Sequence, residues 1–394
     1  MSVKRRSEQS VTLYNLSKAY NGYTMIWAEY AKDAWLIDME GYIVHRWRMP
    51  GTPALHGRLL PNGNLVSAII VKTEKEPGLT GEFSDLGGLL LEVDWEGNPI
   101  WEHKAPYYQE HDFYRMDNGN TLYITWDEEG LVPPDIATKL KGGLSGTEHK
   151  GVMWGDVVRE VNPAGEEVWK WLAYEHLDPE IDILGPVSEY RSIYPHINSV
   201  FSMPNGDILI SMRHTDTVAI IDKATGDVKW RWGPGEIAHQ HDASLLDNGN
   251  ILIFDNGCQR RGYGPTYSRV VEVNPATGKI EWEYKSDPPT DFYTAIEGGC
   301  ERLPNGNTLI TESTKGLVFE VTHKGEIVWE YVVPFYYWGE ATGFYYGEWL
   351  NTLFRANRYG ADYEGLQGRD LDPKKFDWVN RVYGPDAFRK EVVQ

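Results

Sequence analysis

The stretch HQHDASLLDNGNILIFDNG, from His239 to Gly257, decides how the rest of the chain is interpreted. A histidine pair precedes an apolar run, Asp-Asn-Gly-Asn follows, and the β-rich segment ILIF ends at a second Asp-Asn-Gly. Asn-Gly tolerates the positive φ angles that tight hairpin turns need. The stretch therefore predicts strand, turn, strand and turn, with His241 near the start of the first strand.

This turn phrase is one of five clear copies in the chain. The copies share a Gly-containing turn followed by a β-rich run: LLPNGNLVSAI (59–69), RMDNGNTLYIT (115–125), SMPNGDILISM (202–212), LLDNGNILIFD (245–255) and RLPNGNTLITE (302–312). A degenerate sixth copy is GEWLNTLFRANRYG (347–360). Recurrence at this period is the sequence signature of a repeat architecture.

A second phrase alternates with the first. It has an acidic residue or Asn, a small Gly turn and a β-rich run ending in an aromatic residue. Its six copies start 48 to 68 residues apart: IDMEGYIVHRW (37–47), VDWEGNPIWEH (93–103), VNPAGEEVWKW (161–171), IDKATGDVKWRW (221–232), VNPATGKIEWEY (273–284) and VTHKGEIVWEY (321–331).

Each pair of phrases supplies two hairpins, hence four short strands, which make one propeller blade. The sequence therefore predicts an all-β, six-bladed β-propeller, closed by strands from both termini, with loop insertions on one face. A β-sandwich or solenoid of the same hairpins is the alternative. We expect one domain over residues 1–394, with blades over about 24–360 and an extended C-terminal wrap over 361–394.

Three insertions interrupt the repeats, at 74–88, 127–155 and 173–192. The second contains PPDIATKL, where a short helix is expected to begin after the prolines. Long insertions on one side of a rigid scaffold usually shape a binding site.

Charge and cysteine content restrict the function classes. The 58 acidic residues exceed the 38 basic ones, giving a net charge of −20, which disfavours nucleic-acid and anionic-membrane binding.

Cys258 and Cys300 are the two cysteines, so no disulfide framework supports the fold; buried thiols and a single bridge both remain open. No secretory signal or membrane-length apolar run is found, so we expect a soluble, cytoplasmic protein.

Histidines recur at one place in the repeat. His56, His111, His196 and His241 each precede the Asn-Gly turn of their copy by five to nine residues, and Cys300 has this place in the fifth copy. Equivalent positions in radial repeats project onto one ring. Imidazoles there suit a nucleophile, an acid–base group or a metal ligand, although they could also hydrogen-bond neighbouring backbone. The other candidates lack this placement and are expected to be loop or surface groups: His149, His176, His239 and His323.

Arg213 follows the apolar strand DILISM, with His214 after it. The planar fork of a guanidinium suits a sulfate, phosphate or carboxylate group. An ordinary ion pair between blades is the competing interpretation.

The phrases HINSVFSMPNGDILISMRHTDTVAIID (196–222), HQHDASLLDNGNILIFDNG (239–257) with YSRVVEV (267–273), and FRANRY (354–359) resemble the PAPS-independent aryl-sulfate sulfotransferases. The resemblance covers about residues 24–360 and is specific in the two central repeats. It implies a six-bladed propeller that moves a sulfuryl group between phenols through a sulfohistidine, without a nucleotide cofactor. Members of that family are often exported.

Matching motifs assigns roles by resemblance. His241 falls on the histidine that becomes sulfated, His196 on a sulfate-binding histidine, and Arg213 on the essential arginine. Asn198 falls on a polar residue of that pocket. A third family histidine corresponds to His111, with His56 as the competitor. Asn198, His56 and Cys300 are the expected substrate-binding residues.

The expected partners are a small aryl sulfate and a phenol, with a homodimer as a possible assembly. Two other classes stay open. The ring of His56, His111, His196 and His241 could hold a divalent metal ion, or perform lyase or hydrolase acid–base chemistry. The protein could also be a non-catalytic propeller that binds a ligand. Arg213 weakens the metal interpretation, because a cation repels a metal ion.

Overall fold

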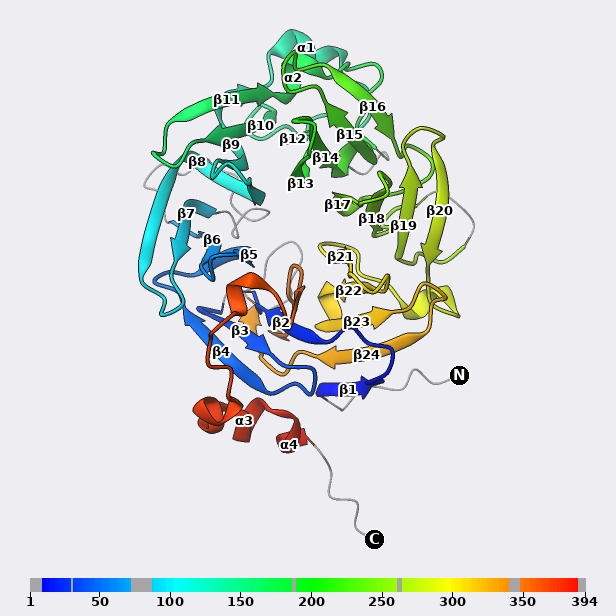
Figure 1. The fold of residues 1–394 in the computed structure, drawn as a ribbon. Coiled ribbons are helices and arrows are strands. Elements are labelled where there is room, and N and C mark those ends of the chain that lie inside the picture. Colours follow the sequence, from blue (N-terminus) through cyan, green and yellow to red (C-terminus); the bar gives the residue numbers. More distant parts are fainter. Residues whose placement is uncertain are drawn as a thin grey trace. The chain divides into compact units, whose positions relative to one another are not determined.

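The computed structural model describes residues 9–29, 31–71, 87–185, 189–260, 264–339 and 348–388. Its fold is all-β, built from antiparallel meanders of the propeller type (Figure 1). Two compact units are present. One contains Met1–Ser67, Glu92–Ile100 and Glu297–Gln394, and the other contains Ala68–Leu91 and Trp101–Ile296. Most of the 74–88 insertion lies outside the described residues.

Two four-stranded meanders in the second unit follow the predicted repeat. The first has the order β13-β14-β15-β16, and the second has the order β17-β18-β19-β20 (green to yellow in Figure 1). Each pairs consecutive strands antiparallel, as two hairpins joined in sequence should. Their bounds are β13 (Ile197–Ser202), β14 (Ile208–Met212), β15 (Thr217–Ile221), β16 (Val228–Trp232), β17 (His241–Leu245), β18 (Ile251–Asp255), β19 (Arg269–Asn274) and β20 (Lys279–Tyr284).

A larger sheet has the order β11-β10-β9-β8-β7-β6-β5, with β12 pairing with β10. The 17-residue strand β8 belongs to both kinds of phrase, because it begins after the Gly97 turn and ends before the Asn118-Gly119 turn. It thereby joins two repeats in one sheet. The bounds are β5 (Pro53–Leu59), β6 (Leu65–Ile69), β7 (Gly87–Val93), β8 (Pro99–Arg115), β9 (Thr121–Leu131), β10 (Trp154–Val161), β11 (Glu167–Leu172) and β12 (Ile193–Tyr194).

Strands from both ends of the chain enter sheets of the first unit. β27 pairs with β2 in the order β27-β2-β3-β4, and β1 pairs with β24 in the order β1-β24-β23-β22-β21. β25 and β26 form a two-stranded ribbon. The bounds are β1 (Ser10–Tyr14), β2 (Gly22–Ile26), β3 (Asp33–Ile37), β4 (Ile43–Arg48), β21 (Gly299–Arg302), β22 (Thr308–Glu312), β23 (Leu317–Val321), β24 (Ile327–Val332), β25 (Tyr337–Gly339), β26 (Glu348–Leu350) and β27 (Asn357–Gly360).

The expectation of six separate, ring-closed blades is not met by strand pairing. Among the described residues, four sheets are single four- or five-stranded meanders, and no ladder of hydrogen bonds links the sheets into a closed ring. The count of separate four- or five-stranded sheets falls short of six at β8, because its continuous backbone merges two repeats in one sheet. The degenerate copy at 347–360 also departs from the prediction, because β26 pairs with β25 while β27 pairs with β2.

The C-terminal tail was expected to be extended, and this is wrong. It contains α3 (Asp377–Tyr383) and α4 (Pro385–Phe388), preceded by short 3-10 turns. The Asn380 amide holds α3 to β4, accepting from Ile43 N at 2.9 Å and donating to Ile43 O at 3.0 Å. The other helices are α1 (Pro134–Lys139), which confirms the helix predicted at PPDIATKL, and α2 (Ala173–His176).

The Asn-Gly turns form as the sequence predicts. In the turn at 246–250, Leu246 N donates to Asn250 O and Gly249 N donates to Leu246 O, both at 2.8 Å. Gly249 has φ 82°, which glycine adopts without the Cβ clash that other residues would meet.

A buried glutamate anchors most of these turns from the next strand. Asn250 Nδ2 donates to Glu272 Oε1 at 2.7 Å. The same pairing recurs as Asn64–Glu92, Asn120–Glu160 and Asn307–Glu320. These pairs satisfy a polar group that burial would otherwise penalise.

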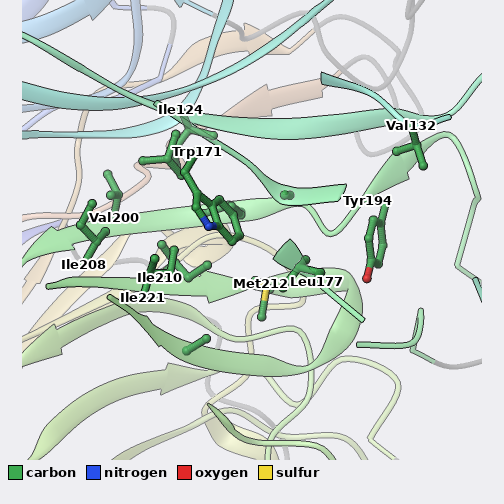
Figure 2. Close-up of a cluster of buried hydrophobic side chains, with 14 of the residues drawn as sticks. Ile124, Val132, Trp171, Leu177, Tyr194, Val200, Ile208, Ile210, Met212 and Ile221 are labelled. Carbon is green, nitrogen blue, oxygen red and sulfur yellow. The ribbon is translucent and has the colours of Figure 1, made fainter. Parts of the chain in front are cut away.

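Apolar side chains pack between neighbouring sheets of the second unit (Figure 2). Ile124 and Trp171, from the large sheet, pack in one cluster with Val200, Ile208 and Ile210 from β13 and β14. The indole of Trp171 also donates to Gly226 O at 2.9 Å, so its polar atom is satisfied while its ring is buried. This packing fixes β13 against the sheet that contains β8 and places their ends close together.

Candidate functional site

Irregular pairing marks the strands of the second unit that carry His111 and His241, and the strand that follows His196. The register shifts between Glu110 and Phe113 in β8, and comparable shifts follow Ile197 in β13 and His241 in β17. His111 has φ 23° and His196 has φ 66°, values that residues with side chains rarely adopt. Such bulges redirect side chains relative to the regular alternation of a strand.

The structure brings three of the predicted histidines together. The His111 ring lies 4.7 Å from that of His196 and 6.5 Å from that of His241, measured between centroids. His196 also stacks on His214 at 4.4 Å. His196 and His241 are buried, whereas the His111 side chain is 17% exposed. The cluster therefore has one member that solvent reaches more readily.

A buried carboxyl group holds the backbone at His196, directly before β13. Asp156 Oδ2 accepts from His196 N at 2.7 Å and from Ile197 N at 3.0 Å, while Oδ1 accepts from Trp126 Nε1 at 2.7 Å. Three hydrogen bonds to one side chain over-determine this backbone, which allows the unusual φ angle to persist.

Burial favours the neutral form of the groups around His196. Burial first, then the positive charges of its neighbours, lowers the pKa of His196 well below its usual range. Burial likewise raises the pKa of Glu110 well above its usual range, with the charge of Asp112 adding to the effect. His196 is therefore a neutral imidazole at neutral pH, with one nitrogen that donates a hydrogen bond and one that accepts one.

One ring nitrogen of His241 is fixed by its neighbours. His241 Nδ1 lies 2.7 Å from Asn256 Oδ1 and 3.2 Å from His239 O. Asn256 Nδ2 donates to Thr294 O at 3.0 Å, which sets the amide orientation because a carbonyl only accepts. Nδ1 must therefore carry a proton, and in the neutral ring Nε2 is the unprotonated nitrogen.

Arg213 begins a 3-10 turn, Arg213–Thr215, directly after β14. Its backbone N donates to His196 O at 2.8 Å, and His214 N donates to Pro195 O at 3.0 Å. These two bonds hold the backbone of Arg213 next to that of His196. The Arg213 side chain is 12% exposed, so its charge lies in a partly desolvated environment.

Glu189, from the 173–192 insertion, joins the groups behind Arg213. Its Oε1 lies 2.6 Å from His239 Nε2 and accepts from Gln259 Nε2 at 3.1 Å, while Oε2 lies 3.1 Å from His214 Nε2. Arg213 Nη1 is 3.9 Å from Oε2. Burial opposes ionisation of Glu189, but the His239 contact and the nearby positive charges lower its pKa to about 2. Glu189 is therefore an anion at neutral pH.

A protein-family model described as Arylsulfotransferase (ASST) matches residues 82–333, well over half of the chain. The chain belongs to the arylsulfotransferase family. No curated protein matches the sequence significantly. The expected resemblance is thus confirmed, and the matched region contains His111, His196, Arg213 and His241.

Solved structures resemble the chain in fold. A protein of unknown function from Bacteroides caccae has a TM-score of 0.51 at 13% identity, over 79% of this chain and 93% of that one. A streptogramin B lyase has a TM-score of 0.47 at 10% identity, over 91% and 96%. Virginiamycin B lyase from Staphylococcus aureus with quinupristin has a TM-score of 0.41 at 11% identity, over 72% and 71%. The two lyase likenesses are too weak to bear on the activity of this arylsulfotransferase family member.

Two expected site residues lie in the first unit. His56 is buried in β5 and stacks on Phe354 at 5.6 Å. Cys300 is buried in β21, opposite Ile310, and both cysteines are free thiols. His111, His196 and His241 belong to the second unit, so the substrate-binding roles expected of His56 and Cys300 stay predictions.

Asn198 and His239 have contacts that the sequence did not reveal. Asn198 Nδ2 donates to Gln240 O at 2.8 Å, which ties β13 to the residue before His241. His239 lies in the loop between β16 and β17, as one of the two expected placements has it, but it is not a surface group, because it is fully buried between Glu189 and Asp216. The reason is its φ of 56°, which turns the ring into the unit.

Sequence reasoning missed the partners of the histidines. Asn256 was interpreted only as part of a turn, Glu189 as part of an insertion, and Glu110 was not singled out. A signal existed for Glu110 and Asn256, because one adjoins His111 and the other ends the strand paired with that of His241. None existed for Glu189, whose contacts depend on tertiary packing.

One group of described residues has the spacing of metal ligands: Glu110, His111 and His196, whose ligand atoms lie within 4.8 Å of one another. The closest two, His111 Nδ1 and Glu110 Oε1, are 2.5 Å apart. Two donors that share a metal ion at about 2.1 Å are roughly 3 Å or more apart. The Glu110–His111 separation instead suits a shared proton. Within the described part of the chain, no helix is long and apolar enough to cross a membrane.

Proposed function

We propose that this arylsulfotransferase family member transfers a sulfuryl group from an aryl sulfate to a phenol, with His241 as the covalent carrier. The observation that carries the proposal is the pair of contacts from His241 Nδ1 to Asn256 Oδ1 and His239 O. They leave Nε2 as the nucleophilic nitrogen, which an imidazole needs for attack on sulfur.

In the proposed first step, the Nε2 lone pair forms a bond to sulfur while the sulfur–oxygen bond to the aryl group breaks. The electron pair of that bond goes to the phenolic oxygen, which takes up a proton. Arg213 and His196 would contact the sulfuryl oxygens, where negative charge is spread during transfer. In the second step, a phenol attacks the sulfohistidine, loses its proton and returns the electron pair to His241.

The proposed site also needs Arg213 held in place. Its backbone bond to His196 O and the Glu189 carboxylate behind it restrict where the guanidinium can go. Preorganised charge of this kind costs no rearrangement during the reaction. Without a bound sulfate ester, Glu189 would also balance the charge of Arg213, because a buried cation without an anion is costly.

The six-bladed count is part of the same proposal. The six aromatic-ended phrases each form one hairpin, and β8 would be the last strand of one blade and the first strand of the next. A crystal structure with six four-stranded blades would support the count of six blades, and a sandwich of two sheets would refute it.

Incubation with 4-nitrophenyl sulfate, followed by intact-mass measurement, tests the function. The wild type should gain one sulfuryl group, release nitrophenol in a burst, and lose the group when a phenol is added. His241→Ala should gain none. His149→Ala is the matched control, since this histidine lies in the 127–155 insertion, and it should behave as the wild type. A wild type that takes up no sulfuryl group would refute the proposal.

A further inference from the structure

We propose that Glu110 is a positioning residue that makes His111 the proton donor and acceptor of the sulfuryl transfer. The inference rests on the proposed function and adds a division of labour among its histidines. His111 would handle the proton of the departing and arriving phenol, and His196 would contact only sulfuryl oxygen.

The first support is geometric. Neighbouring residues of a regular strand point to opposite faces, so Glu110 and His111 should not meet. The bulge at this point and the φ of 23° at His111 bring them to the same side, with Nδ1 2.5 Å from Glu110 Oε1. A strained backbone that creates one specific contact points to a role for that contact.

The second support is the isolation of Glu110. Other buried glutamates of this unit, such as Glu160 and Glu272, accept hydrogen bonds from turn asparagines. The Glu110 side chain is fully buried, and neither of its oxygens makes a hydrogen bond of regular geometry among the described residues; its close contact is the 2.5 Å approach of His111 Nδ1. Such a carboxyl destabilises the fold unless it shares a proton with a neighbour. His111 is the group placed to share it.

The third support distinguishes His111 from His196. His111 is the more exposed ring, so its Nε2 can exchange a proton with a phenol. His196 is buried against His214, beside Arg213, and its low pKa makes it a poor proton carrier. Proton transfer needs a group whose two forms are both accessible near the working pH.

The proton balance follows from this pair. As the sulfur–oxygen bond breaks, protonated His111 gives its Nε2 proton to the aryl oxygen, while the proton at Nδ1 stays shared between His111 and Glu110. The neutral ring then takes the proton of the acceptor phenol as that phenol's oxygen attacks the sulfohistidine. No proton is gained or lost over the cycle, and no co-reactant is needed.

Two donors of different leaving-group basicity test the inference. Phenyl sulfate needs a proton on its leaving oxygen, and 4-nitrophenyl sulfate hardly needs one. Glu110→Gln should lower the rate of His241 sulfation by roughly 100-fold with phenyl sulfate and by less than about 5-fold with 4-nitrophenyl sulfate. Equal losses with both donors would overturn the proton role. Glu272→Gln, which removes a buried carboxylate elsewhere in the unit, should show no donor dependence.

A double variant shows whether Glu110 acts through His111. Adding Glu110→Gln to His111→Ala should cause no further loss with phenyl sulfate, because the proton carrier is already gone. A further loss as large as that in the wild-type background would contradict the inference. If Glu110→Gln folds poorly, Glu110→Ala with added formate restores a carboxylate, and recovery with phenyl sulfate alone is the supporting result.

Failure of the inference differs from failure of the proposed function. Wild-type sulfation with a donor-independent effect of Glu110→Gln would overturn only the proton role. No wild-type sulfation with either donor would overturn the transferase itself. Stoichiometric bound metal whose removal abolishes activity would overturn the inference by making the pair a ligand set.

Discussion

Asn256 offers the most direct test of how the site activates His241. Replacing it with leucine removes the 2.7 Å contact to Nδ1 and keeps the contact of Nδ1 with His239 O at 3.2 Å. A hydrogen bond of a buried polar group contributes about 1–3 kcal/mol, and about 1.4 kcal/mol corresponds to a factor of ten in rate. Because one acceptor remains, we expect loss near the middle of that range, roughly 10- to 100-fold in the rate of His241 sulfation.

Asn256→Asp keeps an acceptor facing Nδ1 and is expected to retain far more activity than Asn256→Leu. Rapid mixing with 4-nitrophenyl sulfate, monitored by nitrophenol release, measures the sulfation step directly. Asn307→Leu is the matched control, since Asn307 is a buried amide of the first unit that binds Glu320. Sulfation by Asn256→Leu at the wild-type rate would refute the idea that Nδ1 contacts select the nucleophilic form of His241.

Three further outcomes are expected. Arg213→Lys should lower kcat/KM about 100-fold while the protein stays folded, because a lysine cannot make the paired hydrogen bonds of a guanidinium; steady-state kinetics and circular dichroism check this. Glu189→Gln should raise the donor KM roughly tenfold and destabilise the fold by about 2 kcal/mol, as measured by urea unfolding, because it uncouples Arg213 and His239 from their anion. Burial lowers the pKa of His214 to about 3. Because the pKa of His214 is lower in the folded than in the unfolded state, its full contribution to the free energy of unfolding is present above about pH 6.5. This free energy should fall as the pH drops toward 3, by up to about 1.4 kcal/mol per pH unit. His214→Gln should flatten this slope in urea titrations at successive pH values.

The hairpins could be predicted from the sequence because their causes are local. An Asn-Gly pair, such as Asn248-Gly249, supplies the positive φ and the side-chain contacts of its own turn. The alternation of apolar residues then sets which strand face is buried. The helices of the C-terminal tail could not be predicted in this way. The Asn380 side chain holds α3 to β4, and this long-range contact leaves no local pattern in the sequence.

The residues of the candidate site likewise fall into those that the sequence could select and those that it could not. Equivalent positions in the repeat were enough to select His111, His196 and His241, and the residue after β14 was enough to select Arg213. Their working partners could not be selected, because side-chain direction at a bulge depends on the register of paired strands.

The sequence by itself determined the repeat, the turns and the family, since each is written in short stretches of chain such as His239–Gly257. Only the tertiary structure decided which ring nitrogen of His241 carries a proton, because Asn256 follows directly after the neighbouring strand β18. It also decided that Glu189 lies against His239, 50 residues further along the chain. Packing sets such contacts, and their strength depends on burial that a linear pattern does not contain.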